Sequence, residues 1–540
     1  MLETKKPFAA GLALALLTAT GCYDFDAAFD DCVQAGQCQP TTCDPLAVDV
    51  PDDLFHDANC DGIDGTPGDA IFVDPAVGQD ANDGTKDAPL KRLSVAMREA
   101  ANKGKAIYLA QGIYDEADLR LERAVSIYGG YSGKEDGWKR GKDNITQIGG
   151  SHTTGFTVNG LMDAGVAIAW VRIRSADSSV SGTPSIGLRV VDSSDVRLSH
   201  VEVEAGKGAQ GRDGDSRAPN TQVGADGGVG QDGSATTPSG GPQGPSSCGT
   251  GSHAGGMGGV GGISFGAAPG MGTAGEPGPP DGGGDGGTPG TNKLDSACGT
   301  TLCVCDGEPG GDGQEGAPGD RGRNGNPGNG TGLLEGSTWV ARSGTDGEAG
   351  AFGKGGGGGG GGGFCEAPGS TQSRGGGGGG GGAGGCPGVG AKGGESGGAS
   401  IAMLLIRGHV NMESCTLKTS GGGQGGAGGR GGDGSPGGPG GAGGKGIVAE
   451  KSSGSDVYRA TGGKGGKGGK GGDGGPGGHG GNGAGGPSVG IWCDSLESSS
   501  VTLTSTPRFE VKDPGAPGAG PGPAAAPGLQ TNHHQCTGFP

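Results

Sequence analysis

Residues 462–486 read GGKGGKGGKGGDGGPGGHGGNGAGG, and every third residue of this stretch is glycine. The same three-residue phase runs through residues 422–446. A chain with three residues per turn would bring the varied residues onto one ridge and leave two faces of bare glycine. The pattern therefore predicts a structural scaffold, and nothing in it indicates an active site. In 462–486 the varied residues are Lys464, Lys467, Lys470, Asp473, Pro476, His479 and Asn482.

Three structures are compatible with these tracts. We favour a bundle of polyglycine II helices, in which bare glycine faces let neighbouring backbones pair, each tract extending roughly 75–80 Å at about 3.1 Å per residue. The second is disorder, because ordering glycine costs more entropy than ordering any other residue. The third is a collagen-like triple helix, since residues 307–330 keep a Gly-X-Y phase.

The composition limits the class of protein. Of 540 residues, 139 are glycine, 30% are apolar and 4% are aromatic, against roughly 45–50% apolar in ordinary globular domains. One large hydrophobic core is excluded, so any core must come from limited segments. The formal net charge of −19 argues against nucleic acid as a partner, because phosphate contacts need clustered lysine and arginine.

The N-terminus is typical of an export signal. Lys5 and Lys6 precede an apolar run over residues 8–17, which is too short to span a bilayer. The Ala-Thr-Gly-Cys that follows resembles the lipobox of bacterial lipoproteins, so we expect acylation of Cys22. An ordinary secretory signal is the alternative. Because Tyr23 and not aspartate follows the cysteine, we expect the outer membrane or the cell surface, with the lipid as the membrane contact.

Cysteine usage fits export, since disulfides form in oxidising compartments. There are 14 cysteines, and setting Cys22 aside leaves an odd number, so one thiol is free, ligated or intermolecular. Cys365 and Cys386 each end a polyglycine run, and we expect that they could pair to close that loop. The spacing of the cysteines does not indicate a zinc site, because there is no CxxC with a matching second pair.

Residues 22–68 are acidic and lack periodic apolar residues, which predicts a stalk. Within it, oxygen-bearing side chains alternate around Gly62, as in loops where such ligands wrap a calcium ion and glycine allows the sharp turn. The match to an EF-hand type loop is partial, because its twelfth position is Gly68. Calcium is the cofactor we expect, and an acidic turn without metal is the alternative. The predicted ligands are Asp57, Asn59, Asp61 and Asp64.

From about residue 70 onward, short apolar runs bounded by glycine predict strands. Residues 89–102 carry apolar residues at helical spacing and predict one amphipathic helix. A two-strand unit at residues 185–203 recurs at 400–417 and, more loosely, at 488–511, and each copy spans roughly 20–25 residues, about one turn of a β-solenoid. The glycine-rich stretches leave this unit at the same corner, so we expect them to pack against one another.

The predicted organisation is all-β: a right-handed parallel β-helix with an N-terminal capping helix and long glycine-rich insertions. The expected segments are a signal peptide (1–21), the stalk (22–68), the first part of the β-helix (69–204), a glycine-rich insertion (205–397), a β-helix turn (398–420), a second insertion (421–486), another β-helix turn (487–512) and a Pro/Gly/Ala-rich tail (513–540).

Several motifs in the predicted β-helix carry a family resemblance. They are Phe72-Val73-Asp74-Pro75, Gly78-Gln79-Asp80-Ala81-Asn82-Asp83-Gly84-Thr85, Ile107-Tyr108-Leu109-Ala110-Gln111-Gly112-Ile113-Tyr114, Ile127-Tyr128-Gly129-Gly130-Tyr131 and Trp138-Lys139-Arg140. These motifs resemble those of pectin-lyase-like, right-handed parallel β-helix surface lipoproteins of myxobacterial type. The resemblance covers about residues 57–204 and the two later turns. It implies that the predicted helix caps the end of the β-helix, which would otherwise expose an open edge.

The resemblance does not define an activity. Some members of this fold superfamily cleave polysaccharides with convergent carboxylates, or with carboxylate-held calcium beside a basic residue, and the sequence does not show such a set. Asp192 and Asp195 are typical of a polar turn, His200 of an outward-facing strand residue, and His479 of a varied tract position. We expect a non-catalytic structural or adhesion protein that contacts surface glycans or other cells. A polysaccharide-binding or polysaccharide-cleaving enzyme is the alternative.

Overall fold

The computed structural model divides into two compact units, residues 1–68 and residues 69–540. The predicted signal peptide and Cys22 lie outside the described residues. The described residues are 44–162, 165–249, 253–263, 276, 278, 282–294, 302–368, 371–495 and 498–539. Among them, no helix is both long and apolar enough to cross a membrane.

Parallel strands form the main sheet of the second unit, along the path β1-β2-β5-β8-β10-β18-β22-β25. Strands β4 and β23 pair with β7 and β18, and β7 pairs with β10. The bounds are β1 (Ala70–Val73), β2 (Ala106–Ala110), β4 (Arg120–Leu121), β5 (Ile127–Tyr131), β7 (Thr154–Asn159), β8 (Val166–Ala169), β10 (Ser185–Ser199), β18 (Ser400–Glu413), β22 (Ser488–Cys493), β23 (Ser500–Leu503) and β25 (Gln530–His534).

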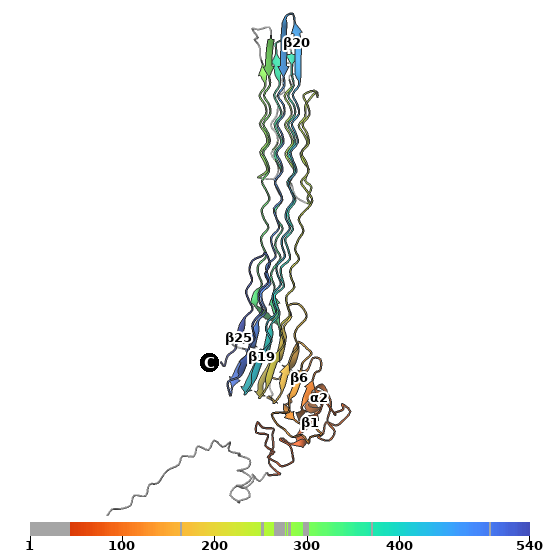
Figure 1. The fold of residues 1–540 in the computed structure, drawn as a ribbon, viewed down its shortest axis with the longest axis vertical. Coiled ribbons are helices and arrows are strands. Elements are labelled where there is room, and N and C mark those ends of the chain that lie inside the picture. The colour runs from red at the N-terminus through yellow and green to blue at the C-terminus, as the bar shows by residue number, and fades with distance from the viewer. Residues whose placement is uncertain are drawn as a thin grey trace, which may run out of the picture. The chain divides into compact units, whose positions relative to one another are not determined.

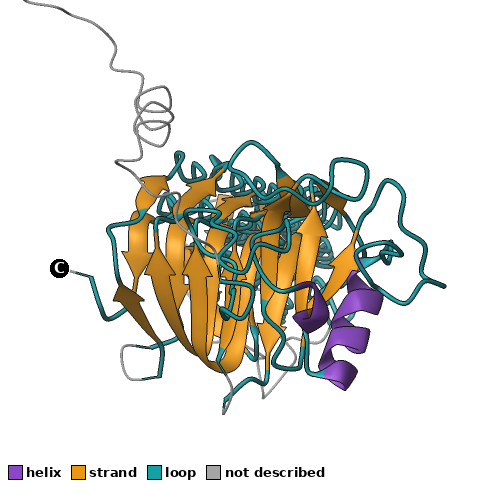
Figure 2. Cartoon of the chain, turned by 90° about the horizontal axis from the view of Figure 1, so that it is seen from below, coloured by secondary structure: helices purple, strands orange, loops and turns teal. Residues whose placement is uncertain are grey.

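A second, six-stranded parallel sheet has the order β24-β19-β11-β9-β6-β3. The chain passes repeatedly from one sheet to the other, and Figure 2 shows the strands lying side by side. This nearly all-β arrangement is compatible with a β-helix. The bounds are β3 (Gly112–Tyr114), β6 (Thr146–Gly149), β9 (Arg172–Arg174), β11 (Glu202–Ala205), β19 (Thr416–Thr419) and β24 (Arg508–Glu510).

The repeated two-strand units stack in register. Ser185 of β10 pairs with Ser400 of β18, which pairs with Ser488 of β22. Inward-facing apolar residues form columns, because alternate side chains of a strand point to opposite faces. One such column contains Ile127, Ile168, Leu198 and Met412, each at most 1% exposed. Burying each such side chain contributes about 1.5–3 kcal/mol.

One α-helix, α2 (Leu93–Lys103), packs against β1 and β2 at one end of the strand order (Figure 2). A short 3-10 turn, η1 (Pro67–Asp69), comes before β1. The helix begins four residues later than predicted, because Leu90 bridges to Val73 and Arg92 is extended. It ends at Lys103, and the following Gly104 has a φ of 63°, which lets its N–H donate to the carbonyl oxygen of Ala100.

The glycine-rich stretches run as long, nearly straight segments between the two sheets and the distal strand β20 (Figure 1). We number them as tracts 1–9, and none of their glycine runs is helix or strand. Their ranges are tract 1 (206–233), tract 2 (239–244), tract 3 (253–262), tract 4 (282–290), tract 5 (307–328), tract 6 (343–364), tract 7 (374–399), tract 8 (421–447) and tract 9 (462–486).

Tract 7 is surrounded by six other tracts. The amides of Gly375, Gly376 and Gly377 donate to tracts 3, 9 and 1, at 2.8–2.9 Å. Amides of tracts 2, 6 and 8 donate to its carbonyls, and each of the six neighbours is bonded to the next. Tract 6 is enclosed in the same way by tracts 3, 4, 5, 7 and 9 and by Glu276. The backbone N–H groups of three consecutive residues thus point in three directions, each toward the backbone of another tract.

The two uninterrupted polyglycine runs, residues 355–363 and 375–382, are the enclosed parts of tracts 6 and 7. A Cβ atom on Gly377, Gly378 or Gly379 would come within 2.1 Å of a carbonyl oxygen of tract 2, 6 or 8, respectively. Real Cβ atoms do not approach another backbone so closely. Any larger residue at these positions must push a neighbour away.

Residues with larger side chains occur on a face of tract 6 or 7 at the level where the neighbouring tract on that face has ended. Cys386 lies on the same face of tract 7 as Gly377, at a level beyond the end of tract 2. It is disulfide-bonded to Cys248. Phe352 lies one level before Gly355, whose Cβ would meet tract 3, and its ring stacks on His253 at 5.0 Å. The positions of the larger residues therefore follow from the lengths of the neighbouring tracts.

Tract 9 lies at the surface of the bundle. In its Gly-Gly-X repeat the glycine amides donate to tracts 6 and 8, and the glycine faces without a Cβ atom lie against tracts 5 and 7. The exposed residues are Lys464, Lys467, Lys470 and Asp473. Pro476 and His479 are half-buried, and Asn482 is buried beneath the tail, where it bonds Gly520. The predicted ridge of varied residues is therefore observed over most of its length.

Tract 5 has the Gly-X-Y pattern that suggested a collagen triple helix. Its phase glycines, Gly310 to Gly328, donate to tract 9 of the same chain, and a Cβ on Gly310 would meet tract 6. The single glycine face is therefore covered within the chain and is not available to two further chains. Side chains at the Y positions also accept hydrogen bonds from the amides of varied residues in tract 9. Asp312 accepts the N–H of Lys467, and Asn324 accepts the N–H of His479.

The distal end, which we call the tip, contains two small sheets. One has β12 (Lys293–Leu294), β16 (Cys365–Ala367) and β17 (Thr371–Gln372), and the other has β13 (Leu302–Asp306), β20 (Val448–Ser453) and β21 (Asp456–Thr461). A hairpin of β14 (Asn329–Glu335) and β15 (Thr338–Arg342) joins tracts 5 and 6 at the opposite end. Trp339 of this hairpin is buried with Trp492.

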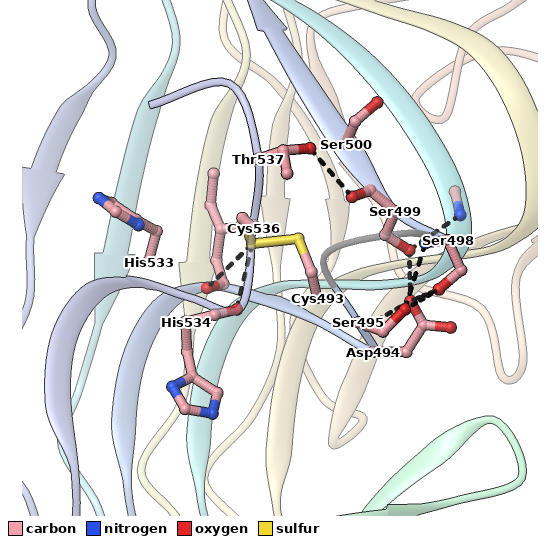
Figure 3. The surroundings of a disulfide bond; sticks show 12 residues. Cys493, Asp494, Ser495, Ser498, Ser499, Ser500, His533, His534, Cys536 and Thr537 are labelled. Carbon is pink, nitrogen blue, oxygen red and sulfur yellow. Dashed lines mark hydrogen bonds between the residues drawn. A yellow bond between two sulfur atoms is a disulfide. The ribbon is translucent and has the colours of Figure 1, made fainter. Parts of the chain in front are cut away.

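The expected pairing of Cys365 with Cys386 is wrong. Cys365 is bonded to Cys305 at the tip, and Cys386 to Cys248. Tract 7 runs straight from Arg374, so Cys386 lies about 37 Å further along it at about 3.1 Å per residue, whereas a disulfide needs Cα atoms within about 7 Å. A third disulfide joins Cys493 to Cys536 beside β22 (Figure 3).

Cys415 is the free cysteine among the described residues. It is buried in the core between the sheets, and burial raises the pKa of its thiol to about 11. A thiol with this pKa is almost entirely protonated at neutral pH, which makes it unreactive.

Substituting Gly379→Ala should open the bundle, because the new Cβ would lie 2.0 Å from the Gly441 carbonyl oxygen. We expect the unfolding free energy to fall by about 3 kcal/mol, combining overpacking of about 1–3 kcal/mol with lost hydrogen bonds of about 1 kcal/mol each. Calorimetric unfolding of the whole chain measures this. Gly141→Ala is the matched control, since its nearest atom would be 3.8 Å away. Equal unfolding temperatures for the two variants would contradict the packing.

Candidate functional site

The predicted calcium loop lies in the first unit. The Asp57 carboxylate accepts the amides of Asp61 and Gly62 at 3.1 and 2.8 Å, and Asn59 also accepts the Asp61 amide. Asp64 instead accepts the amide of Asp52 at 3.0 Å. The first three predicted ligands therefore share one local turn, and the fourth bonds a different segment.

The loop concentrates negative charge. The pKa of Asp49 is raised mainly by burial, and the like charges of Asp57 and Asp61 also raise it. Two hydrogen bonds, from the backbone of Gly65 and Ala58, act in the opposite direction. Within the described residues, no group of three or more His, Cys, Asp and Glu side chains is placed to hold a metal ion. Calcium binding therefore stays a prediction.

Asp192 and Asp195 lie at a corner of the main sheet and both have positive φ. Asp192 pairs with Arg407 at 2.5 Å, and the hydrogen bond from Arg407 lowers the pKa of its carboxyl group. Asp195 pairs with Arg197 at 2.8 Å. Each carboxylate is held by its own arginine, beside the irregularity of β10 between Ser193 and Val196.

His479 also has a structural environment. Its Nδ1 accepts the amide of Gly431 at 3.1 Å, which requires that nitrogen to be unprotonated. Burial lowers the pKa of His479, and the neighbouring Arg321 and Arg430 lower it further. The histidine therefore bridges two tracts in its neutral form.

An aromatic stack occupies the corner between the two sheets. The rings of Trp170 and His200 lie 4.3 Å apart and 6° from parallel. Both residues have positive φ, 55° and 50°, and each connects a strand of the main sheet to a strand of the second sheet. The sequence predicted that His200 faces solvent, but it is half-buried against Trp170.

The stack was not predicted, because residues 166–173 form an apolar run that is typical of one continuous strand and Trp170 lies within it. The chain instead turns at Trp170, so β8 ends at Ala169 and β9 begins at Arg172. The stack could have been found from the positions of the two residues in the sequence. Trp170 and His200 each lie a few residues before the inward-facing apolar residue of the next strand.

An open cleft adjoins this stack. Its lining includes Lys142, Asn144, Thr146, Trp170, Arg172 and Glu202. Glu202 is paired with Arg172 at 3.0 Å and with Lys418 at 3.2 Å. An aromatic ring surrounded by polar groups can bind a ring-shaped ligand with one apolar face. The carboxylate here is neutralised by two cations, which suits binding better than acid catalysis.

Comparison with family models matches part of the chain. Residues 76–181 match the model of DUF1565, described as a protein family of unknown function and associated with parallel β-helices. The match covers the strands from β2 to β9 and includes the motifs from Gly78 to Arg140. No curated protein and no solved structure matches the chain. The comparisons therefore support the parallel β fold and carry no activity.

Proposed function

We propose that this chain is an exported surface lipoprotein with a structural or adhesive role and without catalytic activity. The observation that carries the proposal is the enclosed glycine bundle, in which the 25-residue tract 9 runs between the sheets and the tip. At about 3.1 Å per residue, such a tract spans about 78 Å. A rigid spacer of this length suits a protein that presents its tip away from a membrane.

The architecture that supports this role is a right-handed parallel β-helix capped by α2 and extended by a polyglycine II bundle. Parallel strands that alternate between two sheets need crossover connections, which are right-handed in nearly all proteins. Amides that point in three successive directions are what a three-residue helix without internal hydrogen bonds provides. The glycine insertions then extend one corner of the solenoid.

The cell envelope is the location that fits these features. Disulfides at the tip, beside tract 7 and near the C-terminal segment suit an oxidising compartment. We propose that Cys22 carries the lipid and that the outer membrane or cell surface is the destination. The net charge of −19 favours surface glycans or other cells as partners over nucleic acid.

A second candidate function is polysaccharide binding on the β-helix, and the Trp170–His200 cleft favours it. Sugar rings have one apolar face and a polar rim, which match an aromatic ring flanked by Asn144, Arg172 and Glu202. This site lies on the sheets and is independent of the glycine bundle.

The anchored location predicts that Cys22→Ser releases the protein. Cells producing the unaltered chain should retain it in the membrane fraction, accessible to protease from outside, and should adhere to other cells or to surfaces. The Cys22→Ser variant should appear in the soluble fraction and abolish adherence. Cys415→Ser is the control that leaves the N-terminus intact. Retention of the Cys22→Ser variant in the membrane, or adherence that does not depend on the protein, would refute the proposal.

Polysaccharide binding predicts that Trp170→Ala weakens affinity on a glycan array at least about tenfold, equivalent to about 1.4 kcal/mol. Lys464→Ala, on the exposed ridge of tract 9, should bind as the unaltered chain does. Binding of glycans with undiminished affinity by the Trp170→Ala variant would exclude the cleft, and absence of binding by the unaltered chain would exclude the second function.

Calcium binding at the acidic loop predicts heat release on titration with calcium chloride, with a Kd of about 10⁻⁴–10⁻³ M, as in other extracellular modules. The Asp57→Asn/Asp61→Asn double variant should lose it, because two charged ligands are removed. Asp213→Asn, in tract 1, is the control. Equal titration curves for the unaltered chain and the double variant would indicate an acidic turn without metal.

A further inference from the structure

One strip of the bundle surface, where tracts 8 and 9 lie side by side, changes along its length. The two tracts keep a constant register, in which Gly465 donates to Gly444 and Gly468 donates to Gly441. Because the backbone repeats every three residues, every third residue of each tract faces this strip in the same way. We call the strip the seam.

The tail of the chain occupies the seam at its base. The carbonyl oxygen of Ala516 accepts the N–H of Gly425 at 2.9 Å, and Gly518 donates to the carbonyl oxygen of Gly483 at 2.9 Å. A strand in the seam therefore uses donors of tract 8 and acceptors of tract 9. One level further toward the tip, the side chain of Asn482 takes this place and accepts the next outward N–H of tract 8 at 2.8 Å.

Side chains of tract 9 continue to fill the middle of the seam. Nδ1 of His479 accepts the N–H of Gly431 at 3.1 Å, and the carboxylate of Asp473 accepts the N–H of Gly437 at 3.0 Å. The varied residues of tract 9 therefore project into the seam, each opposite one outward N–H group of tract 8.

Nearest the tip, lysines take these positions and bring no acceptor with them. Lys470 pairs with Asp473 at 2.9 Å, and among the described residues Lys464 and Lys467 form no ion pair. The register places the three lysines opposite outward N–H groups of half-buried glycines, which have no acceptor within the described part of the chain. We call this part the distal seam and define it by Lys464, Lys467, Lys470, Gly440, Gly443 and Gly446.

The charge around the distal seam favours an anionic ligand. Residues 434–446 and 462–473 contain four lysines and one aspartate, a formal net charge of +3, whereas the whole chain has −19. Acidic residues of tract 5 border the other side of tract 9, where Asp312 accepts the backbone N–H of Lys467 at 2.7 Å. An anion is therefore attracted to the seam and not to the neighbouring tract.

We propose that the distal seam binds a linear acidic polysaccharide, with one acidic group beside each lysine. The inference deepens the proposed adhesion to surface glycans and rests on it. Each acidic group would accept one glycine N–H and pair with one lysine, and hydrogen bonds to ionised groups are the stronger kind. The acidic groups should recur at about 9.3 Å, which is three residues at about 3.1 Å each.

This spacing distinguishes the polysaccharide from other anionic polymers. A nucleic acid strand in a duplex carries a phosphate about every 3.4 Å, and an extended peptide presents side chains on one face about every 6.8 Å. A polysaccharide with an acidic group on every second sugar has a repeat comparable to that of the seam. A further glycine-rich strand does not fit, because the lysine side chains fill the place that Asn482 fills where the tail leaves tract 8.

The test titrates the full mature chain with hyaluronan, which has one carboxylate on every second sugar, and with neutral dextran. Hyaluronan should bind and dextran should not, and affinity should fall as salt is raised, because exposed charges are screened within about 8 Å at physiological salt. Lys464→Ala/Lys467→Ala should weaken hyaluronan binding at least about tenfold. Lys134→Ala/Lys139→Ala removes two exposed lysines of the β-helix and is the matched control. Equal affinities of these two variants, or no binding of hyaluronan by the unaltered chain, would overturn the proposal.

A second variant tests the geometry of the seam. Lys467→Asp places a carboxylate opposite Gly443, as Asp473 lies opposite Gly437. It should abolish hyaluronan binding and slow hydrogen exchange of the Gly443 amide, and unchanged exchange would contradict the register.

Other ligands separate this inference from the two proposed functions. Oligothymidylate of the same total charge should bind more weakly than hyaluronan, and equal binding would reduce the seam to general attraction of anions and overturn the proposal. Neutral glycans report on the cleft beside Trp170, and for them Lys464→Ala remains a valid control. If hyaluronan does not bind while cells still adhere through the anchored chain, the distal seam fails and the adhesion role stands; if adherence is also absent, both fail.

Discussion

The hydrogen bond between neighbouring glycine backbones is the interaction on which this structure depends. It forms only where both partners lack a Cβ atom on the facing side, because a Cβ on Gly378 would lie 1.9 Å from the Gly359 carbonyl oxygen. Glycine makes this approach possible but has a high entropic cost of ordering. The bundle offsets that cost by surrounding tracts 6 and 7 with bonded neighbours.

The amount of glycine in a tract follows from its place in the bundle. Tracts 6 and 7 are pure glycine where they are enclosed, tract 9 keeps two glycines in three because one face meets solvent, and tract 5 keeps one in three at the edge. The β-sheets provide the starting register, since β10 and β18 lead through β11 and β19 into tracts 1 and 8, which then bond side by side. A sequence that looks repetitive therefore specifies which place each tract takes in the cross-section of the bundle.

Much of the fold could be predicted because its signals are periodic. The repeat of Ser185, Ser400 and Ser488 indicated the in-register stack, and the three-residue phase indicated one ridge on tract 9. The neighbours of each tract could not be predicted, since glycine carries no side chain that identifies its partner. The Cys365–Cys386 pairing was wrong for this reason. The aromatic corner was missed because Trp170 sits in an apolar run, although the backbone turns there. The acidic loop was found from spacing alone, but spacing could not show that Asp64 bonds Asp52.

Hydrogen–deuterium exchange of the mature chain tests the central claim most directly. The account predicts that peptides covering residues 355–363 and 375–382 exchange many times more slowly than an unstructured glycine peptide, because their amides are bonded to enclosed neighbours. Exchange of these two runs at the rate of the unstructured peptide would contradict the bundle and, with it, the proposed spacer.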